Sequence, residues 1–179
     1  HPDFLSYSTS WVGPTSPLSF EDMKEKSAEE IIENLRKWIP PKGMMVPSPE
    51  GLGRELKSAV EDEPNKFVDA TAQFKDNVDC TYVRHFFYGL QEALNKGKNF
   101  SWEPVIDLAK WVVDQPRDAG SKKYDLPGFD ADENWVATRK AIADLLSYIF
   151  DADKIHIEFR EAVWSVIQLL TEDPDPTPE

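Results

Sequence analysis

The fold is decided by one stretch of the chain, residues 79–97, which reads DCTYVRHFFYGLQEALNKG. Its large apolar side chains recur at helical intervals of three and four residues: Val83, Phe86, Phe87, Leu90 and Leu94. Asp79 is a typical N-cap residue, and Gly97 is typical of a helix C-terminus. The stretch therefore predicts a long amphipathic helix whose apolar face must be buried against other elements.

Similar patterns occur on both sides of this stretch. They predict helices at residues 27–39, 49–61, 64–74, 101–112, 135–149 and 157–170. Ser27 with Glu30 forms the sequence signature of a capping box at the start of the first of these helices. No segment of four or more residues alternates apolar and polar side chains with β-branched enrichment, so the sequence predicts an all-α fold of about seven helices.

The spacing of the helices predicts how they are arranged. Helix pairs that open near residues 27, 64 and 103 are 37 and 39 residues apart, which is in the range of tandem two-helix repeats. Short connections favour antiparallel neighbours. We expect antiparallel pairs stacked as a short right-handed α-solenoid of the HEAT or armadillo type, with a compact helical bundle as the alternative.

The domain organisation follows from the same pattern. Residues 1–18 are expected to form a tail or loop, residues 19–172 a single α-helical repeat domain with a long loop at 115–134, and residues 173–179 an acidic, proline-rich linker or the end of an excised piece. The last helix has no later helix to pack on, and the chain does not begin with Met, so the sequence predicts a piece of a larger protein. Such an end would expose Trp164 and could drive dimerisation through the C-terminal helix.

Composition limits the classes of partner and the compartment. The 179 residues include 33 acidic and 20 basic side chains, a formal net charge of −13, so binding to nucleic acid is disfavoured. The single cysteine, Cys80, allows no internal disulfide, and a buried thiol favours a reducing, cytoplasmic location. No stretch approaches 18 consecutive apolar residues, so no membrane segment is expected.

The chain contains no complete catalytic or metal-binding motif. Gly97-Lys98 lacks the upstream glycine of a phosphate-binding loop, and the pair His156 and Glu158 would need two cysteines to form a zinc deaminase site. Asp130, Asp132 and Asn134 match the first ligands of a calcium-binding EF-hand loop, but Trp135 and Ala141 replace its glycine and its bidentate glutamate. We therefore expect no cofactor, no metal and no enzymatic activity.

An alternative hypothesis is a small acidic hydrolase with a carboxylate and histidine site in a helical groove. It predicts a deep pocket that brings His85, His156 and at least two acids together. The separation of the two histidines in sequence leaves this alternative open, because distant residues can meet in a folded chain.

The loop at 115–134 is the best candidate for a binding segment, because such long connections in compact domains usually have a function. Arg117, Lys122, Lys123 and Tyr124 make it the most basic local patch, with Trp102 and Trp135 as nearby aromatic anchors. The hypothesis is contact with a protein partner, or with an anionic ligand or nucleic acid. Packing inside the fold explains the two tryptophans equally well.

Three parts of the chain resemble a known class of sequence: Trp102 to Val112, then Tyr124 to Gly128 leading to Trp135 and Arg139, and finally Val163-Trp164 to Thr177. They resemble HEAT-like helical segments of very large, poorly characterised prokaryotic proteins. The resemblance covers roughly the second half of the chain. It implies a scaffold or sensor role beside a nucleotide-binding module that this sequence does not contain.

Taken together, these observations favour a non-catalytic helical-repeat scaffold or protein-recognition module. Its expected partner is another protein or other domains of the parent chain.

Overall fold

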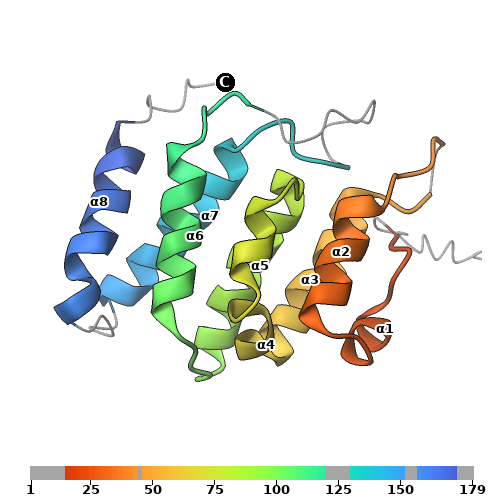
Figure 1. Cartoon of the computed structure of the whole chain (residues 1–179), viewed down its shortest axis with the longest axis horizontal. Helices are drawn as coiled ribbons and strands as arrows, with labels where there is room; N and C mark the ends of the chain where they lie inside the picture. Colours follow the sequence, from red (N-terminus) through yellow and green to blue (C-terminus); the bar gives the residue numbers. More distant parts are fainter. Residues whose placement is uncertain (1–14, 44–45, 120–129, 152–156, 173–179) are drawn as a thin grey trace, which may run out of the picture.

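The computed structural model describes residues 15–43, 46–119, 130–151 and 157–172. These residues form α-helices and short 3₁₀ turns joined by loops (Figure 1). Within them, extended pairing is limited to one isolated bridge between Thr15 and Pro47. The prediction of an all-α fold is confirmed.

The helices follow the predicted order, with two differences. The elements are α1 (Phe20–Lys24), α2 (Ala28–Lys37), α3 (Pro49–Asp62), α4 (Pro64–Val68), η1 (Thr71–Lys75), α5 (Cys80–Asn95), α6 (Trp102–Asp114), α7 (Val136–Asp151), η2 (Ile157–Phe159) and α8 (Arg160–Thr171). The short helix α1 was not expected, because its capping box of Ser19 and Asp22 precedes only five helical residues, too few to show an apolar period.

The helix expected at 64–74 is interrupted, which corrects that prediction. The α-helix ends at Val68, and the chain continues as the 3₁₀ turn η1. The Thr71 hydroxyl donates to the backbone oxygen of Val68 at 2.9 Å, which is the local side-chain bonding that competes with a continuing helix.

The helices lie in two layers (Figure 1). One layer contains α3, α5 and α7 side by side, and the other contains α2, η1, α6 and α8. From α3 onward the chain alternates between the layers, because η1 lies between α3 and α5 in sequence, α6 between α5 and α7, and α8 after α7. Each helix therefore packs beside the preceding helix of its own layer: α5 beside α3, α7 beside α5, and α8 beside α6.

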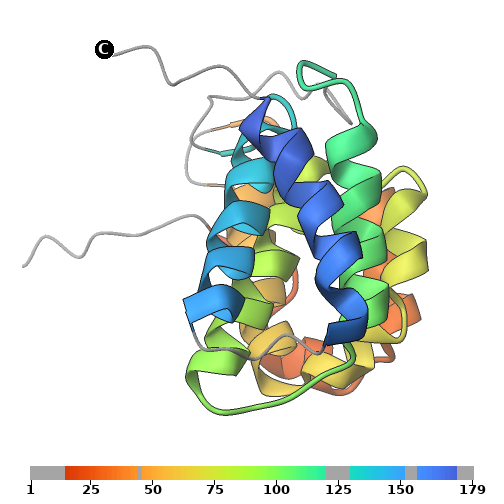
Figure 2. The same ribbon diagram turned by 90° about the vertical axis from the view of Figure 1, so that its left-hand side faces the viewer.

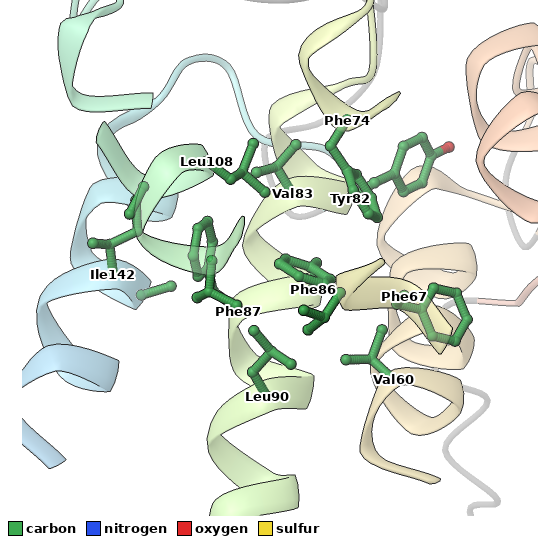
Figure 3. Packing of buried hydrophobic residues seen from close by; sticks show 14 of the residues in the cluster. Val60, Phe67, Phe74, Tyr82, Val83, Phe86, Phe87, Leu90, Leu108 and Ile142 are labelled. Carbon is green, nitrogen blue, oxygen red and sulfur yellow. The ribbon is translucent and has the colours of Figure 1, made fainter. Parts of the chain in front are cut away.

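Helix α5 lies at the centre of this arrangement, between α3 and α7. Its side chains Val83, Phe86, Phe87 and Leu90 are fully buried, and Figure 3 shows them between neighbours from both layers. The rings of Phe86 and Phe74 lie 4.8 Å apart between centroids. Residues 79–97 thus form the central helix of the core, as their pattern predicts.

The ends of α5 and α2 match the capping predictions. The Asp79 carboxylate accepts a hydrogen bond from the backbone N–H of Thr81 at 2.9 Å, and Gly97 has a φ of +75° just beyond the helix. Ser27 and Glu30 make both reciprocal bonds of a capping box at the start of α2.

Candidate functional site

An apolar groove lies between α7 and α8, at the end of the molecule that Figure 2 turns toward the viewer. Its volume is about 500 Å³. Ala143, Leu146 and Ser147 line it from α7, and α8 contributes Trp164, Ile167, Leu170 and Thr171. We call these seven residues, together with Val136, the end face.

The end face exposes large apolar side chains. Trp164 is 59% exposed and Val136 is 38% exposed. The polar groups that line the groove are the hydroxyls of Ser147 and Thr171. A surface of this kind is typical of contact with another apolar surface rather than of catalysis.

The two helices form this face because each buries one stripe of side chains against the body of the protein and contributes side chains of a second stripe to the groove. In α8, Val163 and Val166 are buried toward the body of the protein, whereas Trp164 and Ile167 lie on the adjacent stripe. In α7, the buried stripe contains Ile142, Leu145 and Ile149. A second face of α7 carries Val136, Lys140, Ala143 and Ser147, which recur after four, three and four residues. Lys140 on this face is paired with Asp144 at 2.8 Å. The exposure of Trp164 agrees with the expectation from the sequence.

A buried arginine holds α8 in place beside α6. Arg139 of α7 donates from its guanidinium to the backbone oxygen of Val113 at 2.8 Å and to that of Leu169 at 3.4 Å. Both oxygens lie near the C-termini of their helices, where the partial charge is negative and favours a cation. The same contacts place the N-terminal part of α7 next to the C-terminal ends of α6 and α8.

A second notable cluster joins α3, α5 and the turn after residue 129. Arg84 donates to the Glu50 carboxylate and to the Asp132 carboxylate, each at 2.6 Å. His85 Nε2 lies 3.1 Å from the same Glu50 oxygen, and Arg54 pairs with the other Glu50 oxygen at 3.1 Å. The side chains of Glu50, Arg84, His85 and Asp132 are between 5 and 15% exposed.

Burial, hydrogen bonds and neighbouring charge determine which groups of this cluster are protonated. Burial alone would raise the pKa of Glu50, but the hydrogen bond from His85 and the positive charge of Arg84 outweigh it and lower that pKa to about 2. Burial lowers the pKa of His85, so the ring is neutral at pH 7. Its Nε2–H therefore donates to Glu50, and the unprotonated Nδ1 has no hydrogen-bond partner in the described residues.

The cluster attaches the residues after position 129 to the core. The backbone N–H of Glu50 donates to the Asp130 oxygen at 2.8 Å, and the N–H of Asp132 donates to the Thr81 hydroxyl at 2.8 Å. Both carboxylates are already paired with Arg84, and the groove of the end face does not include His85. His156, which the hydrolase hypothesis also needs, lies outside the described residues.

Of the six residues predicted to bind a partner, the structure describes three. Lys122, Lys123 and Tyr124 fall outside the described residues. Arg117 is half-buried near the start of the connection that follows α6. Arg117 does not line the groove of the end face.

The two tryptophans of that set pack against other aromatic rings. Trp102 is half-buried, and its ring lies 4.8 Å from that of Phe100 between centroids. Trp135 is 4% exposed and lies edge-on to Trp111 at 5.6 Å. In this structure Trp135 is therefore a core residue.

The acids near the start of α7 have structural partners as well. Asp132 pairs with Arg84, and the side-chain oxygen of Asn134 accepts from the backbone N–H of Val136 at 3.0 Å. Sequence reasoning missed the pairing of Asp132 with Arg84, because the two residues are 48 positions apart and no local pattern connects them. For the end face the sequence does contain a usable signal, because Trp164 and Ile167 form a second apolar stripe on α8.

Two features are absent from the described ranges. They contain no group of three or more His, Cys, Asp or Glu side chains placed to hold a metal ion. No helix in the same part of the chain combines the length and apolar composition needed to cross a bilayer. Comparison of the chain with protein-family models, with curated proteins and with solved structures yields no match.

Proposed function

We propose that the chain is a helical-repeat module of the α-solenoid type that acts as a scaffold by contacting another protein. The observation that supports this proposal is the end face, where α7 and α8 leave an apolar groove exposed in the part of the chain that the structure describes. Contact through this face requires no catalytic group, in keeping with a non-catalytic role.

The alternation of the helices supports the solenoid interpretation. Helix α7 packs against α5 in its own layer and against α6 in the other. The groove on α7 and α8 is the equivalent position one step further along the stack. In an array of two-helix units, each unit covers its apolar stripes with the next unit, so an open position at the end of the array is a docking site.

Charge and polarity also favour recognition through apolar burial. The groove is lined by five apolar side chains and two hydroxyls, and it contains no ionisable group. Burial of Trp164 would supply a large apolar contact, and tryptophan is enriched among the residues that dominate protein interfaces.

Affinity capture from a lysate tests this proposal. Four baits are compared: the unchanged chain, Trp164→Asp, Ile39→Asp, and a variant with Arg117, Lys122, Lys123 and Tyr124 changed to alanine. Ile39 is 77% exposed just after α2, which lies at the opposite end of the molecule from α8, so it is a matched control (Figure 1).

We expect proteins that the unchanged chain and Ile39→Asp retain and that Trp164→Asp loses, with the interaction then reproduced from purified components. Loss with the alanine variant alone would assign recognition to the basic segment instead. Equal capture by all four baits would contradict a contact through either surface.

A further inference from the structure

We propose that the end face binds an amphipathic helix of another protein, and that this helix carries Lys or Arg side chains along the flank that lies next to α8. The inference rests on the proposed function, because the same end face makes the contact. It adds the conformation and the charge of the partner.

The groove favours a helix because it offers no hydrogen-bond donor to an extended backbone. Its two hydroxyls already donate within their own helices: Ser147 to the backbone oxygen of Ala143 at 2.9 Å, and Thr171 to that of Gln168 at 2.7 Å. The rest of the lining is apolar. An extended segment would therefore bury carbonyl groups without partners, which is costly. A helix satisfies these groups internally and presents only its side chains to the groove.

The length of the groove fits two to three turns of such a helix. The lining residues of α8 run from Trp164 to Thr171, which is about 10 Å at 1.5 Å per residue. A partner helix lying along the groove would place apolar side chains against it at intervals of three, four and seven residues. A contact of this size belongs to the weak, transient class, so we expect a dissociation constant on the order of 10–100 µM.

The charge of the partner follows from the outer side of α8. Glu161, Gln168 and Glu172 are exposed and recur after seven and four residues, so they form one stripe beside Trp164. We call these three residues the acidic flank. The last turn of α8 contains no basic residue, so the partial negative charge of its C-terminal carbonyl groups adds to that of Glu172. Lys or Arg side chains of the partner complement this flank, and the net charge of −13 favours encounter with a cationic partner.

Two cations near the groove do not neutralise the acidic flank. Lys140 of α7 is paired with Asp144 at 2.8 Å. Arg160 lies one turn before Trp164 on the stripe that continues to Thr171, so it is at the N-terminal end of the groove and not on the acidic flank. The basic side chains of the partner are therefore expected on the α8 side of the groove, because the pair on α7 is already neutral.

Designed peptides test the conformation and the charge of the partner. Three labelled peptides of about 18 residues, roughly five helical turns, are titrated with the purified chain up to about 500 µM and followed by fluorescence anisotropy. The first carries leucines on one helical face and lysines along one flank of it. The second has glutamate in place of each lysine, and the third has the composition of the first in an order that removes the apolar face. We expect the first to bind about tenfold or more tightly than either of the others.

Variants of the chain show whether the lysine peptide occupies the end face. Trp164→Ala should weaken its binding by about tenfold, because the indole is the largest exposed side chain of the groove. Glu161→Gln combined with Glu172→Gln should weaken it several-fold and reduce its dependence on salt. The matched control combines Glu29→Gln with Glu25→Gln and should have no effect. Like the test pair, these exposed residues are the second residue of one helix and the C-cap of another. Circular dichroism checks that each variant is folded.

The inference is overturned if no peptide binds, if the lysine and glutamate peptides bind alike, or if binding survives either Trp164→Ala or removal of the two charges of the acidic flank. A dimer in sedimentation velocity that Trp164→Ala abolishes would also overturn it, because a second copy would then occupy the face. The proposed function would fail differently, through capture from a lysate that does not depend on Trp164. Capture that does depend on Trp164, without a preference for the lysine peptide, contradicts the basic helix and supports the recognition module.

Discussion

At the scale of single residues, Glu50 shows how the chain uses a buried charge. Its carboxylate receives hydrogen bonds from Arg84, His85 and Arg54, so the cost of burying the charge is offset by close partners. Through Arg84 the cluster also holds Asp132, which begins the approach to α7. These residues serve to position a chain segment, and both carboxylates are neutralised in doing so.

The Glu50→Gln variant tests this role. The pKa of Glu50 is about 2 in the fold, against an ordinary value of 4.5, so the unfolded state binds more protons between these two values. The stabilisation is therefore present above about pH 4.5 and lost as the pH falls toward 2. We expect Glu50→Gln to lower the free energy of unfolding by about 1–3 kcal/mol at pH 7 and to flatten its dependence on pH in this window.

Urea denaturation of both proteins at a series of pH values measures this effect. Burial lowers the pKa of His85, so protonation of this ring also destabilises the fold as the pH falls below the ordinary imidazole pKa of 6.5. The exposed residue Glu29 supplies the control variant Glu29→Gln. Parallel pH profiles for the unchanged chain and Glu50→Gln would contradict the assignment.

At the scale of elements, α3 and α5 pack closely because glycine lies at two points of their contact. A Cβ atom on Gly53 would lie 2.2 Å from the imidazole Cδ2 of His85. One on Gly89 would lie 2.7 Å from the Cβ of Val60 and 2.8 Å from the backbone oxygen of Lys57. Glycine weakens an isolated helix, yet at these positions it allows the helices to approach.

The Gly89→Ala variant separates these two effects. Helix propensity alone would favour alanine by about 1 kcal/mol. The added methyl group, however, would lie too close to the backbone oxygen of Lys57, which is fixed in α3, so the helices must move apart. We expect a net destabilisation of about 1–3 kcal/mol by thermal or chemical denaturation. Ser58→Ala, at an exposed position on α3, should change stability little, and a stabilised Gly89→Ala variant would show that the contact is loose.

At the scale of the whole molecule, burial is uneven along the stack. Helix α5 has neighbours of its own layer on both sides, whereas α8 has α6 on one side and the open end face on the other. In a layered array, stability depends on contacts between neighbouring units, so the end with fewer contacts opens more readily.

Hydrogen exchange measured by mass spectrometry tests this gradient. We expect the slowest exchange in α5 and the adjoining α3, and faster exchange in α8. Uniform protection from α3 to α8 would indicate one cooperative bundle rather than a stack of units.

The sequence predicted much of the secondary structure, because helical periodicity and capping are local. Val83, Phe86, Phe87 and Leu90 identified the central helix, and Ser27 with Glu30 located the start of α2. Where a local rule competed with another, the prediction failed. The Thr71 hydroxyl, which bonds to the carbonyl of Val68 as α4 ends, is an example.

For the candidate site too, only features local to one helix could be predicted from the sequence. The sequence led us to expect an exposed Trp164 on the last helix, and the structure confirms it, because this side chain is 59% exposed. Tertiary structure alone decided that α7 lies beside it to form a groove, and that Trp135 lies in the core against Trp111. It also decided that Glu50, Arg84 and Asp132 meet. Such contacts depend on how distant segments pack, and neither periodicity nor composition records that packing.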